Sequence, residues 1–543
     1  MNLSPTAYVD GFARDHLPPD DQWPTLEFTL DELHYPDRLN AGAELLLAGD
    51  DSRPALRTPD GTVWTYADLR LRAAQVAQVL TEDLGLVPGN RVLLRSPNNP
   101  WTVAVWLGTL LAGGIVVTTM AALRARELAP IVTKTQPSVA LVDHRHVDDV
   151  LAIRAGSAPD LRVVAFGGAG ADDLSVLAAA KSGTFTPIDT AADDVALFGP
   201  TSGSTGVPKI TIHFHRDLLS IDHTFGRPLI GLRPDDVVAC TAPLAFTFGL
   251  GMLVVFTLRA GACSFLTEAA TPPQLADLVA KHGVTVLATA PTAYRLILKT
   301  DNIDKLSGLR AAVSAGEHIP QPVWEEIRRR LGLSVIDGIG ATEMLHIFIS
   351  AAGDDIRPGA TGRPVPGYRA TILGPDGRPV PRGTEGRLAV IGPVGCRYLD
   401  DDRQRNYVVD GWNLTGDTFV EDDDGYFHYR ARNDSMIVSA GYNIGAPEVE
   451  AALDTHPDVL EAGVIGEADP ERGTIVSAFV VLREGLTGDD ATVRALQDHV
   501  KAELAPYKYP RRIRFVAALP RNTSGKLQHF KLRQQVRTEE DSA

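Results

Sequence analysis

Cysteine is scarce in this sequence of 543 residues. Its three cysteines are Cys240, Cys263 and Cys396, and no two of them form a C-x-x-C pair. A disulfide framework or a cysteine-based zinc site needs more thiols at closer spacing. We therefore expect neither, and the scarcity of cysteine indicates a reducing compartment.

Basic charge and long apolar runs are also in short supply. The chain carries 52 Lys and Arg against 68 Asp and Glu, a formal net charge of -16. This balance disfavours nucleic acid and anionic membrane surfaces as partners. The most apolar stretch, residues 248–266, is interrupted by Arg259 before it reaches membrane-spanning length, and the N-terminus lacks the apolar core of a signal peptide. We expect a cytoplasmic protein without a membrane partner.

The chain is long enough for more than one core. From about Thr65 to Thr300, helical patterns alternate with short apolar runs, which is typical of α/β layers with largely parallel sheets. Beyond about Gly359, strands and tight turns dominate, and the last hundred residues mix helical and strand-like patterns. The predicted fold class is α/β: a large N-terminal domain of layered α/β sheets with a small β-rich subdomain (1–433), then a small α+β domain (434–543).

The segment PTSGSTGVPK, residues 200–209, concentrates glycine, hydroxyl groups and one lysine. Val207 and Pro208 separate Gly206 from Lys209, so the segment does not fit G-x-x-x-x-G-K-[ST]. Residues 210–215 alternate with the period of a strand, whereas a P-loop is followed by a helix. Glycine frees the backbone and hydroxyls can donate to phosphate oxygens. The pattern predicts a phosphate-binding strap between two strands, with a polar hairpin connection as the alternative.

Several motifs in a fixed order give the sequence a family resemblance that covers nearly the whole chain. They are TSGSTGVPK (201–209), GIGATE (338–343), LTGDTF (414–419), RARND (430–434) and RNTSGKL (521–527). With them the sequence resembles the adenylate-forming superfamily of acyl-CoA synthetases, carrier-protein adenylation domains and luciferases. The resemblance implies that a carboxylate attacks the α-phosphate of ATP, pyrophosphate leaves, and the acyl-AMP passes its acyl group to the thiol of coenzyme A (CoA).

The resemblance also implies a role for each matching residue. The β- and γ-phosphates of ATP would be held by Thr201, Ser202, Gly203, Ser204, Thr205, Gly206 and Lys209. Adenine would be framed by Ser314, Ala315, Gly316, Glu317, Asp337 and Gly338. Thr342 would donate to the α-phosphate, Glu343 would bind Mg²⁺, and Asp417 with Arg432 would hold the ribose. A carboxylate such as Asp417 is otherwise often a turn residue, so these roles depend on the motifs occurring together.

The C-terminal domain carries the catalytic lysine in this reading. Lys526 would bridge the substrate carboxylate and the α-phosphate, where its charge stabilises the transition state. The resemblance implies that this domain is mobile, with Asp434 at its hinge, and that rotation brings the loop around Gly441 to the thiol. The chain departs from many relatives at Val438, where they carry lysine.

Three residues indicate which carboxylic acid the enzyme would activate. Gly340 leaves room where the short-chain branch of the family has a bulky tryptophan, Phe246 would stack on a planar acid, and His346 would contact a ring substituent. A buried histidine bonded to the backbone is the alternative for His346. The chain is most similar to aryl-acid CoA ligases of the benzoate and 2-aminobenzoate type, so we expect a small aromatic carboxylic acid, with 2-aminobenzoate favoured.

Other interpretations stay open at this point. The enzyme would act as a monomer or homodimer with ATP, Mg²⁺ and CoA, but an aryl-acid adenylating enzyme that loads a carrier protein in trans would show the same motifs. A non-catalytic nucleotide sensor is a further alternative. An ADP-releasing ATPase is disfavoured by the Val207-Pro208 insertion and the strand that follows.

Overall fold

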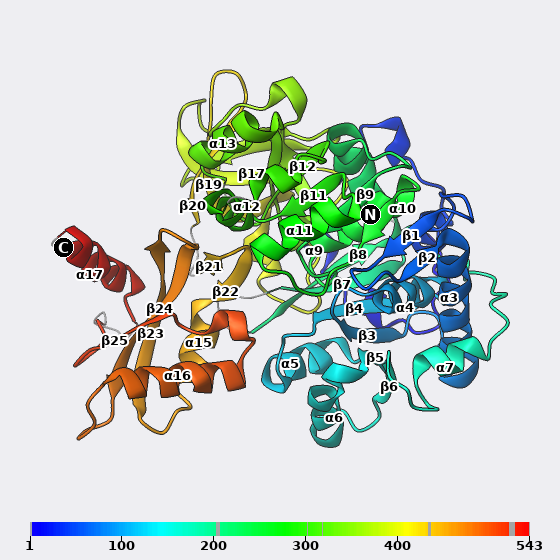
Figure 1. Ribbon diagram of the computed structural model, residues 1–543, viewed down its shortest axis with the longest axis horizontal. Helices are drawn as coiled ribbons and strands as arrows, with labels where there is room; N and C mark the ends of the chain where they lie inside the picture. The colour runs from blue at the N-terminus through cyan, green and yellow to red at the C-terminus, as the bar shows by residue number, and fades with distance from the viewer. Residues whose placement is uncertain are drawn as a thin grey trace. The chain divides into compact units, whose positions relative to one another are not determined.

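A computed structural model describes residues 3–201, 207–300, 302–317, 319–432, 436–520 and 527–541 (Figure 1). The chain divides into two compact units, which are treated separately below. Unit 1 comprises Met1–Ala121, Ile131–Thr201 and Ile210–Ala431. Unit 2 comprises Ala122–Pro130, Ser202–Lys209 and Arg432–Ala543. No helix in the described part of the chain is long and apolar enough to cross a bilayer.

A six-stranded sheet forms the first layer of unit 1. Its strands, in sheet order, are β6 (Arg162–Phe166), β5 (Val139–Asp143), β3 (Arg91–Ser96), β4 (Ile115–Met120), β7 (Val195–Thr201) and β8 (Lys209–Phe214). The pairs from β6 to β7 are parallel. Helices α3 (Tyr66–Gln78) and α4 (Pro100–Leu111) pack against each other beside this sheet (Figure 1). Thr65 and Asn99 cap their N-termini with side-chain hydrogen bonds.

A nine-stranded sheet forms the second layer and supports the candidate site. Its strands, in sheet order, are β15 (Arg363–Pro364), β14 (Ile347–Ser350), β13 (Val335–Gly340), β12 (Ala311–Ser314), β11 (Val286–Thr289), β9 (Val237–Cys240), β10 (Cys263–Phe265), β1 (Pro54–Arg57) and β2 (Val63–Thr65). The pairs from β1 through β10, β9, β11 and β12 to β13 are parallel. β13 then pairs antiparallel with β14.

A third, antiparallel sheet completes the strands of unit 1. It contains β16 (Arg369–Leu373), β17 (Glu385–Ile391), β19 (Trp412–Glu421), β18 (Val408–Val409) and β20 (Phe427–Arg432). The other described α-helices outside the C-terminal segment are α1 (Phe12–Asp15), α2 (Ala41–Leu45), α5 (Ala125–Thr135), α6 (Val147–Gly156), α7 (Leu174–Ala179), α8 (His215–Ile221), α9 (Thr247–Leu250), α10 (Thr257–Arg259), α11 (Pro272–His282), α12 (Pro291–Lys299), α13 (Gln321–Leu331) and α14 (Gln404–Tyr407).

Unit 2 has its own small α+β core. β23 (Val459–Asp469), β24 (Gly473–Leu482) and β25 (Arg512–Phe515) form one sheet, and β21 (Met436–Ser439) and β22 (Tyr442–Gly445) form a hairpin. Helix α15 (Ala446–Leu453) packs on β23 and on α16 (Asp490–Glu503), as Figure 1 shows, and α17 (His529–Asp541) also packs on β23. Arg512 and Arg514, part of a basic C-terminal segment, both pair with the buried Glu467.

The predicted fold class is confirmed, with one local correction. Two strands, β7 and β8, flank the phosphate-loop motif, as the alternating pattern predicts. His215 continues that alternation in the sequence but begins α8 instead, where the Asp217 carboxylate accepts a hydrogen bond from the Phe214 backbone N–H and stabilises the helix start. The proposed domain limits, 1–433 and 434–543, stay a prediction.

The β13–β14 pair approaches so closely at Gly340 that only glycine fits there. A Cβ at this position would lie 2.8 Å from the carbonyl oxygen of His346 and 3.0 Å from the nitrogen of Ile347, both backbone atoms. We expect Gly340→Ala to lower the free energy of unfolding by about 1–3 kcal/mol, because backbone must shift to make room. Urea denaturation measures this. Gly308→Ala is the control, since a Cβ there meets nothing within 4 Å, and equal losses in both variants would contradict the prediction.

Candidate active site

The predicted site residues of unit 1 gather where parallel strands end. β9, β11, β12 and β13 run in parallel, so the loops that follow them leave the same edge of the sheet. These loops carry Phe246 after β9, Ala315–Glu317 after β12, and Thr342 and Glu343 after β13. In open α/β sheets this edge is where ligands bind.

The side chains of Asp337 and Ser314 form the first part of the site. The two residues are direct neighbours in the parallel register of β12 and β13, and both are buried. The Asp337 Oδ1 and the Ser314 Oγ have no hydrogen bond of normal geometry to a described residue, although the Ser314 hydroxyl acts to lower the pKa of Asp337. Burial raises the pKa of Asp337 to about 7. An unpaired acceptor and hydroxyl at the end of parallel strands fit the polar edge of a heteroaromatic base.

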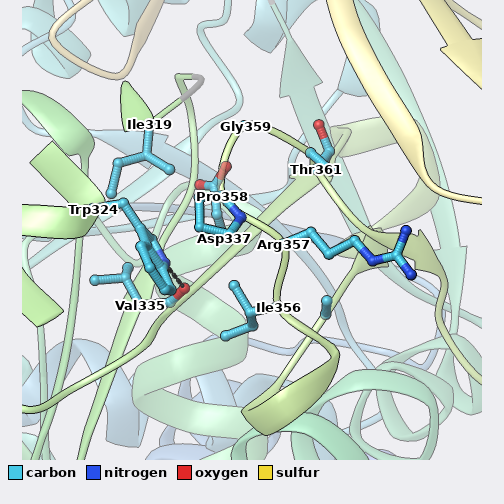
Figure 2. A pocket seen from close by; sticks show the side chains of 11 residues that line it. Ile319, Trp324, Val335, Asp337, Ile356, Arg357, Pro358, Gly359 and Thr361 are labelled. Carbon is cyan, nitrogen blue, oxygen red and sulfur yellow. Dashed lines mark hydrogen bonds between the residues drawn. The ribbon is translucent and has the colours of Figure 1, made fainter. Parts of the chain in front are cut away.

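A pocket lies beside Asp337 (Figure 2). It is small and is lined by Ile319, Trp324, Ile356 and Pro358 among others. The guanidinium of Arg357 extends away from Asp337 in Figure 2 and pairs with Asp424 at 2.7 Å. The pocket therefore leaves the carboxyl group of Asp337 without that cation, in agreement with its raised pKa.

The segment after β12 turns sharply. Gly316 has a φ of +89°, which glycine adopts without strain. Glu317 is half-buried, and its Oε2 accepts a hydrogen bond from the Thr292 hydroxyl at 2.7 Å. Thr292 belongs to the first turn of α12, directly after β11, so two adjacent loops of the sheet edge are fastened together.

The segment after β13 reverses the chain. Thr342–Met344 form a single 3₁₀ turn, and Leu345 follows with a φ of +66° and a ψ of −30°. This conformation is sparsely populated for a leucine and costs on the order of 1–3 kcal/mol. Leu345 is fully buried, so packing holds the strained turn in place.

Glu343 is a buried carboxylate within this turn. Its Oε1 accepts a hydrogen bond from the hydroxyl of Tyr398, and burial next to Glu343 raises the pKa of Tyr398 well above its usual range. The hydroxyl therefore stays protonated and orients the carboxylate. No group of three or more His, Cys, Asp or Glu side chains that could hold a metal ion occurs within the described ranges. One oriented carboxylate fits Mg²⁺, which keeps most of its waters and uses substrate phosphates as ligands.

His346 lies on the other side of the turn, inside a cluster of phenylalanines. Its ring centroid is 4.7 Å from that of Phe256, 5.1 Å from that of Phe225 and 5.8 Å from that of Phe248. It is buried, and neither ring nitrogen makes a hydrogen bond of normal geometry in the part of the chain that the structure describes, although the Phe248 backbone lies close enough to act on its pKa. Burial lowers the pKa of His346 to about 3, so the imidazole is neutral.

Two of the predicted acid-side residues lie near this cluster in sequence. Phe246 caps α9, which also carries Phe248, and is half-buried. Gly340 is exposed at the end of β13, and the close backbone approach described above accounts for the glycine without reference to a substrate. Phe248 could have been predicted from the sequence, because it lies in the same PLAFTFGLG segment as Phe246. Phe225, Phe256 and Tyr398 carried no local signal.

The remaining predicted residues are distributed as follows. Asp417 is buried in the middle of β19, next to Gly416 with a φ of +80°. Gly441, with a φ of +81°, forms the two-residue turn of the β21–β22 hairpin together with Ala440. Thr201 and Lys209 end β7 and begin β8. Ser202–Gly206, Asp434, Lys526 and the side chain of Arg432 lie outside the described residues.

Comparison with known proteins identifies the family. Residues 47–397 match the AMP-binding enzyme family, and residues 448–526 match the AMP-binding enzyme C-terminal domain. The chain is 36% identical over 512 residues to the benzoate–CoA ligase of Thauera aromatica, covering 92% of this chain and 97% of that protein. It is 33% identical over 482 residues to the 4-hydroxybenzoate–CoA/benzoate–CoA ligase of Rhodopseudomonas palustris, covering 87% and 88%.

A solved structure agrees with these relatives. The anthranilate CoA ligase AuaEII in complex with anthranoyl-AMP superposes with a TM-score of 0.73 at 30% identity, covering 94% of this chain and 100% of that chain. The chain therefore belongs to the AMP-binding enzyme family. The predicted resemblance and the enzyme class, an AMP-forming acid–CoA ligase, are confirmed, and so is the use of ATP, Mg²⁺ and CoA at the level of the family.

Three buried neutral histidines make stability depend on pH. Burial lowers the pKa of His213 and His215 to about 4 and that of His346 to about 3, whereas unfolded histidine titrates near 6.5. Below pH 6.5 the unfolded chain binds protons that the folded chain does not, so stability falls as the pH falls. The raised pKa of Asp337, about 7, has the opposite effect, because this group increases the free energy of unfolding as the pH falls. It is one group against three histidines.

We expect the free energy of unfolding to fall by about 1 kcal/mol or more per pH unit between pH 6 and pH 5. Urea denaturation at several pH values measures the slope. Replacing His215 by glutamine removes one titrating group and should make the slope shallower. A flat profile in the wild-type protein would contradict the prediction.

Proposed function

We propose that this protein is an aryl-acid–CoA ligase with 2-aminobenzoate as its preferred acid. In the first half-reaction a carboxylate oxygen forms a bond to the α-phosphorus of ATP and pyrophosphate leaves. In the second, the CoA thiol attacks the acyl carbon, loses its proton and releases AMP. The names of the benzoate and anthranilate ligases support an aryl acid and CoA as the substrates. They give no support to a carrier protein as the acceptor.

The observation that carries the choice of acid is the unpaired imidazole of His346. Three phenylalanine rings around it provide an apolar surface for a planar ring. A neutral imidazole has one acceptor nitrogen, which can receive a hydrogen bond from an ortho amine. Benzoate has no such donor and would leave the buried nitrogens unpaired. Phe246 and Gly340 are proposed to border the same acid.

The nucleotide is proposed to bind along the sheet edge. Ser314–Glu317, Asp337 and Gly338 would hold adenine, where the unpaired Asp337 Oδ1 is available to accept from an amino group. Asp417 and Arg432 would hold the ribose, and Thr342 would donate to the α-phosphate. The strap from Thr201 to Lys209 would hold the β- and γ-phosphates. Mg²⁺ bound at Glu343 would neutralise phosphate charge, and Tyr398 keeps that carboxylate oriented.

The C-terminal residues are assigned by family resemblance. Lys526 would bridge the carboxylate and the α-phosphate during adenylation. Asp434 would serve as the hinge of a C-terminal domain, residues 434–543, that alternates between the two half-reactions. Gly441 would face the pantetheine chain in the second one. Its turn has a φ of +50° at Ala440 and +81° at Gly441.

A panel of acids tests the proposed substrate. With ATP, Mg²⁺ and CoA, we expect 2-aminobenzoate to give the highest kcat/KM for pyrophosphate release, followed by benzoate and hydroxybenzoates. In His346→Leu, which removes the acceptor and keeps an apolar surface, kcat/KM for 2-aminobenzoate should fall roughly tenfold relative to benzoate, the worth of one hydrogen bond.

Benzoate is the internal control in this experiment, because any general damage to the pocket lowers both rates. An equal loss for the two acids would refute the role of His346. Activity confined to aliphatic acids would refute the aryl-acid proposal, and thioester formation on a carrier protein but not on CoA would refute the acceptor.

Lys526→Ala separates the two half-reactions. We expect acyl-AMP formation from acid and ATP to fall by at least about a thousandfold, because charge stabilisation at the α-phosphate is lost. Thioester formation from supplied acyl-AMP and CoA should stay within a few-fold of the wild-type rate. Stopped-flow or quenched-flow assays of each half-reaction measure this. Equal losses in both would show that Lys526 has another role.

A further inference from the structure

The edge of β8 is covered by a segment from elsewhere in unit 1. The Ile212 N–H donates to the Arg397 carbonyl at 2.7 Å, and the Leu399 N–H donates to the Ile210 carbonyl at 2.9 Å. Thr211 and Tyr398 form an antiparallel bridge between these bonds. Residues 397–399 thus pair with β8 through one isolated antiparallel bridge. This segment includes Tyr398, whose hydroxyl orients Glu343.

His213 on β8 reaches the same turn as Tyr398. Its Nε2 lies 2.8 Å from the carbonyl oxygen of Thr342, and the side chain is completely buried. A carbonyl oxygen only accepts hydrogen bonds, so Nε2 carries the ring proton. Nδ1 then has a lone pair and no hydrogen-bond partner among the described residues.

Burial keeps the ring of His213 neutral, and the charges around it do not reverse this effect. The carboxylate of Asp217 lies 3.9 Å from Nδ1, but it already pairs with the buried guanidinium of Arg397 at 2.5 Å and accepts from the Phe214 N–H at 2.9 Å. Arg397 also stacks over the Phe214 ring at 4.0 Å. Asp217 raises the pKa of His213 and Arg397 lowers it, but burial is the larger effect and leaves the imidazole neutral.

The carbonyl oxygen of Thr342 accepts two hydrogen bonds, one of which comes from His213. It accepts from the Leu345 N–H at 3.1 Å within the turn, and His213 occupies its second acceptor position. The turn contains the strained Leu345, with its φ of +66°. A hydrogen bond from a rigid, buried strand therefore fixes a segment whose own backbone conformation is unfavourable.

We propose that His213 is a positioning residue for adenylation. Its Nε2–H holds the Thr342 carbonyl and so sets the directions of the Thr342 hydroxyl and the Glu343 carboxylate, while Tyr398 fixes Glu343 from the adjacent segment. β8 begins at Lys209, the last residue of the phosphate-loop motif, so one strand links that residue to the Thr342–Glu343 turn. The inference rests on the proposed function, in which Thr342 and Glu343 act on the phosphates.

The test compares His213 with a matched control two residues away. His215 is equally buried, its pKa is also lowered to about 4, and it bonds to the Ala41 N–H and the Tyr8 hydroxyl rather than to Thr342. The variants are His213→Phe, which keeps an aromatic ring without a donor, His213→Gln, which restores an N–H at similar reach, and His215→Phe. Each is assayed by 2-aminobenzoate-dependent exchange of labelled pyrophosphate into ATP, by Mg²⁺ titration and by urea denaturation.

We expect His213→Phe to lower kcat for exchange by about tenfold to a hundredfold, the effect of a displacement near 1 Å, with KM for the acid unchanged within about twofold. His213→Gln should recover kcat to within about threefold of wild type, and His215→Phe should stay within about twofold. The concentration of Mg²⁺ for half-maximal exchange should rise only in the His213→Phe variant. If that variant does not fold, His213→Asn, whose shorter amide cannot reach Thr342, replaces it.

Two outcomes would overturn the inference while leaving the proposed function intact. Equal losses of kcat in His213→Phe and His215→Phe would indicate a purely structural role. A failure of His213→Gln to recover activity in a stably folded protein would show that the N–H donor is not the relevant feature. Absence of any acid-dependent exchange in the wild-type protein would instead refute the proposed function itself.

Discussion

The reversal of the chain between β13 and β14 sets the geometry on which the rest of the site depends. β13 enters this turn as a parallel neighbour of β12 and continues into β14, its own antiparallel partner. At Gly340 the two strands approach so closely that a Cβ would lie 2.8 Å from the His346 carbonyl. Thr342 and Glu343 precede the strained Leu345, and His346 follows it. One rigid turn therefore separates the groups proposed to act on phosphate from the group proposed to contact the acid.

The ionisable groups buried around this turn are either paired or neutral. A buried charge is costly unless it is paired, and Arg397 with Asp217 satisfies that condition at 2.5 Å. Burial keeps the neighbouring His213 neutral, so it works as a hydrogen-bond donor rather than as a cation. Tyr398 likewise stays protonated beside the Glu343 carboxylate. The turn is thus oriented by two neutral hydrogen-bond donors, His213 and Tyr398.

Local sequence patterns predicted most elements of the fold and part of the site. The alternation of helical patterns with short apolar runs from about Thr65 to Thr300 predicted the α/β layers, and Ser314 and Glu343 were named from motifs. The role of Tyr398 could not be predicted, because its partner Glu343 is 55 residues away in the sequence. The Asp217–Arg397 pair likewise spans 180 residues. The alternation of polar and apolar residues from 210 to 215 predicted a strand. Both faces of β8 are buried, so its polar side chains face packed layers as its apolar side chains do. Contacts of this kind depend on topology, which no single segment encodes.

The glycine at position 340 shows why a motif alone is weak support for a substrate. The sequence suggests that Gly340 opens a pocket, yet the backbone approach requires glycine whatever the substrate is. The argument for an aryl acid therefore shifts to His346, whose two ring nitrogens are buried without a partner in the described chain. Asp337 and Ser314 are unsatisfied in the same way at the nucleotide side. Buried polar groups that lack partners cost about 1–3 kcal/mol each, and proteins tolerate such costs chiefly where a ligand supplies the partner. Two sets of unpaired groups, on β12–β13 and beyond the turn, therefore support the binding of two ligands, one at each end of the Thr342–Glu343 turn.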